Sequence, residues 1–338
     1  MPSAVTIINC IKRSTLSHTT THPTQSHFIL EKLFHSIIMP PFPSPTKTWH
    51  SKAYPSISPA RPELSQKGKT VLITGGGTGI GAGTAHAFAE AGAARIALLG
   101  RREQPLLDTK ASIQKQYPSV EVFTASVDVT KTDEVNAAFE AFVPLDSGKK
   151  INVVVSNAGT TGPMGGFLAV SDQDYLDGIA SNVSMAWNVA RAFVPRAAPD
   201  ATAIDINSNA AHVTYGDAFA SYSVAKWANV RLWQLVQFNN PGFSVYSIQP
   251  GVVDTDMNRL AGGIKAMNYE DHVSLPASFN VWLASPESDF LKGKFLWTNW
   301  DVDELKEQAD EIEKTHKYSV EMVGYPFGGG NVPETAWS

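Results

Sequence analysis

The chain carries the stretch Thr74-Gly75-Gly76-Gly77-Thr78-Gly79-Ile80-Gly81, which begins where the run from Lys69 to Thr74 ends. The run is typical of a short buried strand, and the alanine-rich segment from Gly79 to Ala91 is typical of a helix that Gly92 ends. Glycines in such a turn let the backbone approach a pyrophosphate, and the helix start offers N–H groups and the positive end of its dipole. The stretch therefore predicts a dinucleotide site, with Thr74, Gly75, Gly79, Ile80 and Gly81 as candidate contacts.

The segments that follow alternate between strand and helix patterns. We expect further strands at Arg95 to Leu99, Val120 to Val127, Ile151 to Ser156, Ala201 to Ser208, Phe243 to Gln249 and Lys294 to Thr298. Helices are expected between them, at 103–117, 132–142, 172–195, 218–238 and 275–285. This alternation predicts an α/β fold of the Rossmann type, a doubly wound parallel sheet of about seven strands in three α/β/α layers. It forms a single domain over residues 67–300.

A second pattern lies further along the chain. Ser208 stands fourteen residues before the tyrosine of Tyr222-Ser223-Val224-Ala225-Lys226. A tyrosine and a lysine four residues apart project from one face of a helix, so the ammonium can lie beside the phenol and favour its ionised form. A tyrosine in that setting can act as a general acid or base. Such a pair occurs by chance in many helices, but together with the glycine turn it indicates carbonyl–alcohol redox chemistry on a nicotinamide cofactor.

Residues 67–300 resemble the short-chain dehydrogenase/reductase family, in its single-domain branch and in particular its fungal members. The resemblance implies that Tyr222 is the catalytic acid or base and that Lys226 tunes it and binds the nicotinamide ribose. It also implies that Ser208 donates a hydrogen bond to the substrate oxygen. Many relatives place this serine thirteen residues before the tyrosine, where this chain has Asn209. The Ser-x-Ala-Ala-His form that begins at Ser208 is also known in fungal members, which favours Ser208.

The same resemblance assigns further residues around the cofactor. It implies that Asn182 supports a relay water, that Asp128 contacts the adenine and that Asn157 closes the sheet edge beneath the cofactor. Val253 and Thr255, in Pro250-Gly251-Val252-Val253-Asp254-Thr255, correspond to the family segment whose threonine holds the nicotinamide carboxamide. Ser156 departs from the asparagine that the family usually has there, a modest change in local hydrogen bonding.

Cofactor choice rests on the residues after the second expected strand. About 20 residues after the last glycine, an NAD enzyme places an Asp or Glu on the ribose 2′-hydroxyl. This chain has Leu99-Gly100-Arg101-Arg102 instead. A guanidinium can receive the 2′-phosphate of NADP in bidentate fashion. We therefore expect NADP(H) in preference to NAD(H), with Arg101 as the contact; the alternative is that both arginines are ordinary surface charges.

Composition argues against several other classes of function. The net charge is −5 and no run of Lys and Arg interleaves with aromatics, so no nucleic-acid partner is expected. The only cysteine, Cys10, excludes an internal disulfide and a cysteine-based zinc cluster. His212 and His272 lack companion ligands at metal spacing, so no metal is expected and both are interpreted as loop residues. No apolar run approaches the length of a transmembrane helix.

The two ends of the chain differ from its middle. Residues 1–66 hold nine of the 21 prolines and only two acids, which predicts a disordered or extended segment without a core of its own, although Thr48 to Leu64 can still lie against the domain. Because acidic residues are scarce there, residues 1–38 are compatible with a mitochondrial transit peptide. Without such a peptide, a cytoplasmic location is expected. The start is either Met1 or Met39. Residues 301–338 are predicted to be a helical surface appendage, with one helix from Asp301 to Lys317.

The expected substrate is a small neutral molecule. Segments 160–167, 209–219 and 252–272 are candidate pocket walls. They are largely apolar, and their main positive charge is Arg259. Their large apolar residues are Met164, Phe167, Tyr215, Met257, Leu260 and Met267. Such walls suit an apolar ketone or alcohol better than a phosphorylated or polycarboxylate substrate. The expected function is an NADP(H)-dependent oxidoreductase that interconverts a carbonyl and a secondary alcohol, in fungal secondary metabolism.

Other functions stay open as alternatives. One is an NAD-dependent alcohol dehydrogenase of primary metabolism, and another is a catalytically silent member of the family that serves as a cofactor-binding scaffold. Retention of Ser208, Tyr222 and Lys226 together argues against the silent scaffold. An epimerase or dehydratase of the extended branch would have a differently spaced glycine turn. Trp187, Trp227 and Trp233 lie on the two long helices that family members pair across a dimer face, so a homodimer or homotetramer is expected; the alternative is that they fill the side of the sheet.

Overall fold

The computed structural model describes residues 42–214, 218–264 and 268–321. The sheet, the described helices and the candidate site all belong to the unit that begins at Ser44. Several predictions fall outside the described residues. They concern Cys10, the transit segment at 1–38, the start at Met39, and the pocket residues Tyr215 and Met267.

A parallel sheet of seven strands runs through the described part of this unit, in the order β3-β2-β1-β4-β5-β6-β7. Its strands are β1 (Thr70–Thr74), β2 (Arg95–Gly100), β3 (Glu121–Ser126), β4 (Ile151–Ser156), β5 (Ala197–Ile206), β6 (Ser244–Gln249) and β7 (Phe295–Trp297). Every neighbouring pair is parallel. The predicted doubly wound sheet is confirmed, and each strand lies within a few residues of its predicted place.

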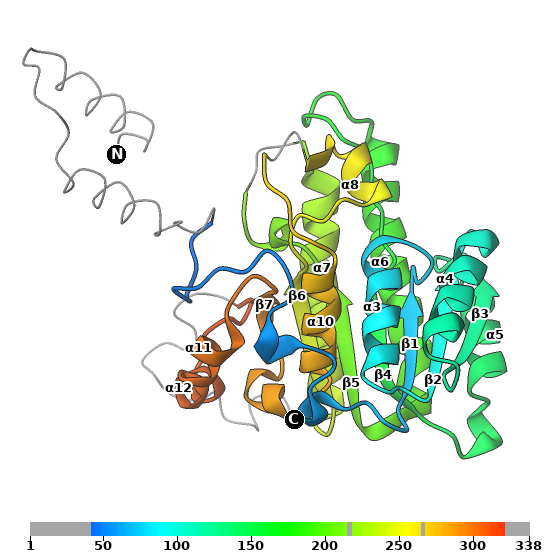
Figure 1. Ribbon diagram of the computed structural model, residues 1–338. Coiled ribbons are helices and arrows are strands. Elements are labelled where there is room, and N and C mark those ends of the chain that lie inside the picture. Colours follow the sequence, from blue (N-terminus) through cyan, green and yellow to red (C-terminus); the bar gives the residue numbers. More distant parts are fainter. Residues whose placement is uncertain (1–41, 215–217, 265–267, 322–338) are drawn as a thin grey trace, which may run out of the picture. The chain divides into compact units, whose positions relative to one another are not determined.

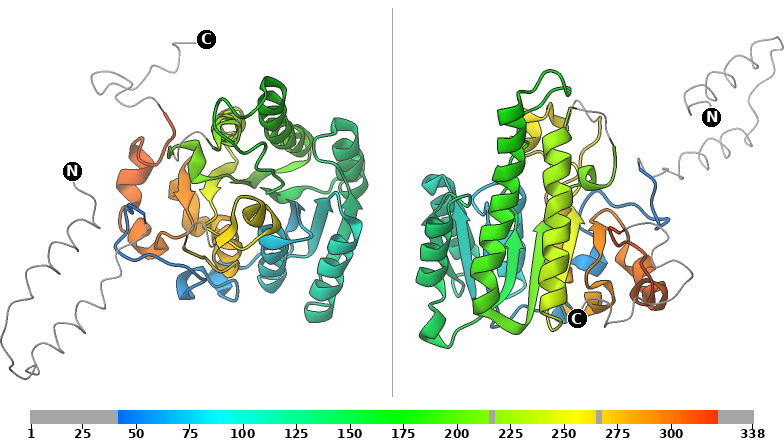
Figure 2. Two further views of the ribbon diagram at one scale, coloured as in Figure 1. Left: turned by 90° about the horizontal axis from the view of Figure 1, so that it is seen from above. Right: turned by 180° about the vertical axis from the view of Figure 1, so that it is seen from behind.

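Helices cover both faces of this sheet, as the front view of Figure 1 and the rear view in Figure 2 show. One face carries α3 (Gly79–Glu90), α4 (Glu103–Gln116) and α10 (Ser274–Leu283). The other carries α5 (Thr132–Phe142), α6 (Asp172–Phe193) and α7 (Ala220–Asn239). The three-layer α/β/α arrangement predicted from the sequence is therefore present.

The strands are buried on both sides, which explains their continuous apolar runs. Leu72, Val154 and Ala203 are fully buried and belong to a core that also takes in Phe139 of α5 and Phe193 of α6. Full burial of each of the larger of these side chains, those of Leu72, Val154, Phe139 and Phe193, stabilises the fold by roughly 1.5–3 kcal/mol. The packing of the sheet between helix layers therefore fixes the positions of the strand ends.

The three helix tryptophans divide into two kinds. Trp233 of α7 is fully buried and fills the side of the sheet, which was the alternative interpretation. Trp187 of α6 and Trp227 of α7 are each 53% exposed. The two exposed indoles leave an aromatic surface on the outer side of the α6–α7 layer.

Residues 44–66, called the strap from here on, lie against the rest of the domain. They include the short 3-10 turns η1 (Pro55–Ile57) and η2 (Pro62–Leu64), and Ile57 and Leu64 are fully buried. The strap runs beside the C-terminal helices, blue beside orange-red in Figure 1. Backbone N–H groups of Lys47 and Thr48 donate to the Glu304 carboxylate. Hydrogen bonds thus connect the strap to the C-terminal helices.

The C-terminal region differs from its prediction in two ways. The single helix expected from Asp301 to Lys317 is instead two short helices, α11 (Val302–Lys306) and α12 (Ala309–Lys314). Val302, Leu305 and Ile312 are fully buried, so these helices are packed on the domain rather than standing off its surface. The sequence pattern did not predict that these helices are packed on the domain, because the three apolar positions stand among many acidic residues.

Candidate active site

The glycine turn lies where the order of the sheet reverses, between β1 and β4. The Gly75 backbone has a left-handed φ of 67°, and a Cβ there would come within 2.6 Å of Asn157 Nδ2. Asn157 Nδ2 donates to Thr74 O at 2.8 Å, and the N–H groups of Asn157 and Ala158 both donate to Thr74 Oγ1 at 3.0 Å. Hydrogen bonds of Thr74 and Asn157 therefore join the end of β4 to the turn. Doubly wound sheets bind ligands at this crevice.

The turn has the shape that a pyrophosphate needs. A Cβ at Gly81 would lie 2.1 Å from Gly75 O, so the turn and the first residues of α3 are in close contact. Among the described residues, no side chain caps the N-terminus of α3, which starts at Gly79 with Ile80 and Gly81 in its first turn. An uncapped helix start leaves backbone donors for an anion. The residues present fit a dinucleotide phosphate group.

Two arginines at the end of β2 have different surroundings. Arg101 is exposed and close enough to Asp128 to help lower the pKa of that carboxyl, although the main cause is hydrogen bonding from Thr130. Arg102 forms an ion pair at 2.9 Å with Asp256 of α8 (Asp256–Leu260). No pattern in the sequence indicates the partner of Arg102, which lies 154 residues further on.

The catalytic tyrosine and lysine of the prediction lie on α7, one turn apart. Lys226 is only 4% exposed, its Nζ donates to Ile206 O at 2.7 Å, and it lies 5.6 Å from the centre of the Tyr222 ring. The Asn207 side chain donates to Lys226 O at 3.1 Å. The structure therefore brings the lysine, the tyrosine ring and the end of β5 together.

Ser208 follows directly, at the start of the short turn η5 (Asn209–Ala211). Ser208 is half-buried, and its Oγ accepts from Ala210 N at 3.1 Å. Asn209 is 7% exposed, and its backbone N–H donates to Gln249 Oε1 at 2.7 Å. Of the two candidates for the substrate-binding position, Ser208 is the more accessible.

Asn182 lies on α6 with both ends of its amide engaged. Its Oδ1 accepts from Thr160 N at 3.1 Å, and its Nδ2 donates to Thr160 O at 3.0 Å and to Gly178 O at 3.1 Å. A Cβ at Gly159 would lie 3.5 Å from Asn182 Oδ1 and 3.9 Å from Lys226 Nζ. Asn182 thus holds the loop after β4 against the lysine.

Sequence reasoning missed Asp205, which lies under the site on β5. It is fully buried, and burial raises the pKa of its carboxyl, while the nearby Lys226 charge and hydrogen bonds from Asn207 and Ser247 lower it. Buried carboxyls are rare without partners. An acid inside the expected buried strand from Ala201 was the signal that could have found it.

The loop after β6, residues 250–255, reaches the glycine turn. A Cβ at Gly79 would lie 2.9 Å from Thr255 Cγ2. Thr255 Oγ1 accepts from Asn258 N at 3.1 Å and so caps α8. The structure places Thr255 beside the turn, whereas Val253 forms a parallel bridge with Asp271.

Three apolar residues of the expected substrate walls are exposed. Met164, Phe167 and Leu260 are 43%, 70% and 76% exposed. A cavity of about 270 Å³ lies beside the start of α7, lined by Pro163, Gly165, Gly166, Phe167, Val170, Asp172, Tyr175, Ala220 and Ser221. Arg259 is paired with Asp254 at 2.9 Å and with Asp256 at 3.0 Å, so its charge is balanced within α8 and its approach.

Two searches of the described ranges, 42–214, 218–264 and 268–321, bear on other kinds of site. In these ranges no three His, Cys, Asp or Glu side chains gather as metal ligands would. Nor does any helix in them combine the length and apolarity needed to cross a membrane. His212 instead accepts a hydrogen bond from Trp297 Nε1 at 3.3 Å, and His272 bonds to Ser274 Oγ at 2.8 Å.

Comparison with known proteins agrees with this geometry. A family model described as short chain dehydrogenase matches residues 69–262, which is more than half of the chain. The chain belongs to the short-chain dehydrogenase/reductase family. A short chain dehydrogenase/reductase of Claviceps purpurea is 35% identical over 267 residues, covering 78% of this chain and 88% of the relative. One from Aspergillus aculeatus is 30% identical and covers 82% and 95%.

Solved structures of the family share the fold. A short-chain dehydrogenase/reductase from Mycobacterium ulcerans superposes with a TM-score of 0.63 at 24% identity, covering 69% of this chain and 89% of that one. An alcohol dehydrogenase from the archaeon Thermococcus sibiricus, solved with 5-hydroxy-NADP, gives 0.60 at 25% identity, covering 68% and 96%. Members of the family are oxidoreductases that act on small molecules with NAD(H) or NADP(H).

Proposed function

We propose that this chain is an NADP(H)-dependent oxidoreductase that interconverts a carbonyl and a secondary alcohol on a small, largely apolar substrate. The observation that carries the proposal is the buried Lys226, held by Ile206 O and lying 5.6 Å from the centre of the Tyr222 ring beside the Ser208 turn. A buried ammonium next to a phenol favours the charge that the phenol acquires on releasing a proton. That arrangement suits a general acid for carbonyl reduction.

Each residue has a role in this proposal. When bound, the reduced nicotinamide supplies a hydride to the carbonyl carbon. The Tyr222 hydroxyl gives its proton to the carbonyl oxygen as negative charge develops there, and Ser208 donates a hydrogen bond to the same oxygen. Lys226 stabilises the resulting phenolate, and its stem is fixed by the bond to Ile206 O. Asn182 keeps the loop after β4 in place through Thr160.

The cofactor half of the site is proposed to consist of the turn and the strand ends around it. Thr74, Gly75, Gly79, Ile80 and Gly81 would hold the pyrophosphate. Asp128 would contact the adenine, Asn157 would close the sheet edge beneath the cofactor, and Val253 and Thr255 would lie at the nicotinamide. The exposed Arg101 supports a choice of NADP(H), because a guanidinium at the end of β2 can reach a 2′-phosphate while Arg102 is paired with Asp256. The Thermococcus sibiricus relative, solved with 5-hydroxy-NADP, agrees with this choice.

The balanced charge of Arg259 and the exposed apolar side chains of Met164, Phe167 and Leu260 support a neutral substrate. The relatives from Claviceps and Aspergillus are fungal, and we propose a step of fungal secondary metabolism. The exposed Trp187 and Trp227 support a homo-oligomer built on the outer side of α6 and α7.

The test is a turnover assay with purified full-length protein. NADPH and NADH are each offered with a panel of neutral apolar ketones and, as controls, phosphorylated ketones, and loss of the reduced-nicotinamide absorbance is followed. Consumption of NADPH with apolar ketones, abolished in Tyr222→Phe, is the expected result. Tight NADPH binding with no turnover on any carbonyl or alcohol would instead favour the silent scaffold.

A further inference from the structure

The loop at 250–255 is held from outside the sheet by one buried carboxylate, that of Asp271. Asp271 is 1% exposed, its Oδ2 accepts from Val252 N at 2.7 Å, and its own N–H donates to Val252 O at 2.8 Å. Gly251 has a φ of 89°, and a Cβ there would lie 2.6 Å from Asp271 Oδ2. The carboxylate is therefore pressed against the loop backbone, one residue before Val253.

The other oxygen of Asp271 faces the strap. Oδ1 accepts from the Tyr269 hydroxyl at 2.7 Å and from Asn299 Nδ2 at 2.8 Å. The Tyr269 hydroxyl in turn accepts from Trp49 Nε1 of the strap at 2.8 Å. Asn299 is tied to the strap as well, since His50 N donates to Asn299 O at 2.9 Å and Asn299 Nδ2 donates to His50 O at 2.8 Å.

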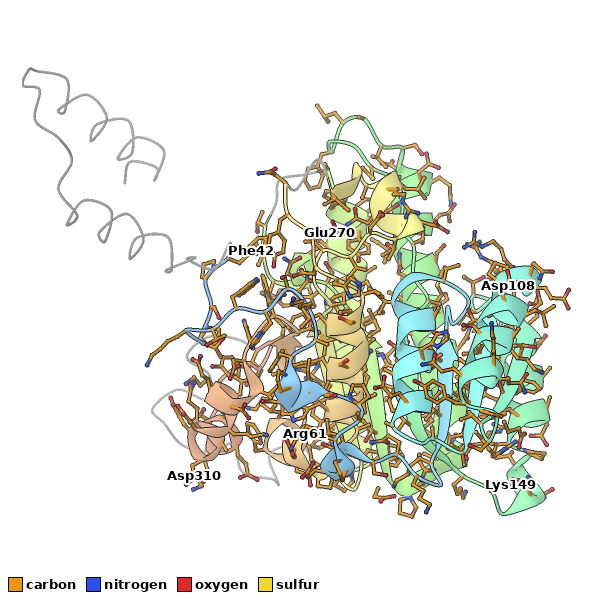
Figure 3. All side chains as sticks on the ribbon, in the orientation of Figure 1. Phe42, Arg61, Asp108, Lys149, Glu270 and Asp310 are labelled. Atoms are coloured by element: carbon orange, nitrogen blue, oxygen red, sulfur yellow. The ribbon has the colours of Figure 1, made fainter. Side chains whose placement is uncertain are left out.

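These bonds form a continuous path from the strap to the candidate cofactor site. It begins at Trp49, passes through Tyr269 and Asp271, and ends at Val252. Thr255 then carries the loop to Gly79 of the glycine turn. Figure 3 labels Glu270, which stands between Tyr269 and Asp271 in the chain, toward the end of the domain where α8 lies. Buried groups in such a path are costly to leave without partners, so each one limits the movement of the next.

We infer that Trp49, Tyr269 and Asp271 are positioning residues that fix the 250–255 loop for the nicotinamide end of the dinucleotide. The strap is then part of the active-site architecture, even though the segment precedes the nucleotide-binding fold in the sequence. This inference rests on the proposed function, because it takes that loop as the place of the nicotinamide. The proposed contacts of the adenosine end, Arg101 after β2 and Asp128 after β3, are not part of this path, so the path should act mainly on the nicotinamide half of the cofactor.

The experiment compares whole cofactors with fragments that lack the nicotinamide. Calorimetry gives the dissociation constants of full-length wild type, Trp49→Phe, Tyr269→Phe and Asp271→Asn for NADP(H) and NAD(H), and for 2′-phospho-ADP-ribose and ADP-ribose. Tyr269→Phe should weaken binding of the preferred dinucleotide about three- to tenfold, the worth of one or two hydrogen bonds, and leave fragment binding unchanged. Asp271→Asn should weaken it more, because an amide presents a donor to groups that are themselves donors.

Tyr54→Phe is the matched control on the same strap. The Tyr54 hydroxyl donates to Trp300 O at 3.2 Å and accepts from Val302 N at 2.9 Å, so its loss lowers the melting temperature through contacts with the C-terminal helices. It should leave the ratio of dinucleotide to fragment affinity as in wild type. An unchanged ratio in Tyr269→Phe and Trp49→Phe, or an equal change in Tyr54→Phe, overturns the inference alone. A wild type that binds neither dinucleotide overturns the proposed function and the inference with it.

Discussion

Replacing Glu287 by glutamine should remove the ion-pair cluster that fastens the strap to the C-terminal helices. Glu287 lies in η6 (Pro286–Leu291), and its carboxylate accepts from Arg61 Nη2 of the strap at 2.7 Å, Trp282 Nε1 at 3.1 Å and Lys306 Nζ. Figure 3 shows Arg61 on this side of the domain. The side chain is 21% exposed, so solvent screens the cluster only in part.

The size of the effect follows from the pKa of Glu287. Burial alone would raise it, but the hydrogen bonds and charges of Arg61 and Lys306 outweigh burial and lower it from 4.5 to about 2. A lowering of about 2.5 units at 1.36 kcal/mol per unit corresponds to about 3 kcal/mol, an upper value given the residual exposure. Because the folded-state pKa is depressed, this stability is present above about pH 4.5 and is lost as the pH falls toward 2.

Urea unfolding at pH 7, 5, 4 and 3 measures this effect. Glu287→Gln should lower the free energy of unfolding by about 1–3 kcal/mol at pH 7, and the gap to wild type should narrow as the pH falls below 4.5. Glu63→Gln is the control, since Glu63 pairs with the same Arg61 at 3.4 Å but is 59% exposed. That control should change stability by less than about 0.5 kcal/mol. A gap that is absent at pH 7, or that stays constant down to pH 3, would refute the reasoning.

Three further predictions concern the site and the ends of the chain. Tyr222→Phe should lower turnover on the order of 100- to 10,000-fold while the dissociation constant for NADPH stays within a few-fold of wild type; near-full activity would disprove the mechanism. Arg101→Ala should reduce the preference for NADPH over NADH about ten- to a hundredfold, whereas Arg102→Ala should change it less; titrating both cofactors decides, and a wild type that prefers NADH defeats the assignment. Deleting residues 1–38 should leave the melting temperature and NADPH affinity unchanged, whereas deleting residues 1–66 should lower the melting temperature by at least about 5 °C through loss of buried Ile57 and Leu64; a large drop with the shorter deletion would show that the first segment is structural.

The sheet could be predicted from the sequence because its strands are short apolar runs between glycine and helix signals. β4 was placed at its observed bounds, Ile151 to Ser156, since all but one of its residues are apolar or small and a polar loop follows. β5 begins at Ala197, four residues earlier than expected, because Pro199 and Asp200 break the apolar pattern. The local sequence pattern therefore predicts the interior of each strand, whereas pairing with neighbouring strands determines where each strand begins and ends.

The candidate site was predictable to the extent that its residues stand at fixed spacings. Tyr222 and Lys226 could be predicted because they are one helical turn apart. The glycine turn could be predicted because it lies at a single strand–helix junction. Three other features follow no fixed spacing and could not be predicted in this way. They are the pairing of Arg102 with Asp256, the buried carboxyl of Asp205 under Lys226, and the hydrogen bond from Trp49 to Tyr269. They join residues that only the folded sheet brings together, so no single segment of sequence contains them.

The contact between the strap and the C-terminal helices sets the order in which the chain can complete its fold on the ribosome. Lys47 and its acceptor Glu304 are separated by 257 residues. At a synthesis rate of about 5–20 residues per second, the strap waits roughly 10–50 s for its partner after it emerges. Ile57 lies in η1, which packs against α10 and α11, so its covering surface is incomplete during that time. The strap is thus made among the first described segments and docks among the last, so premature termination before Glu304 leaves an apolar segment open to chaperones or aggregation.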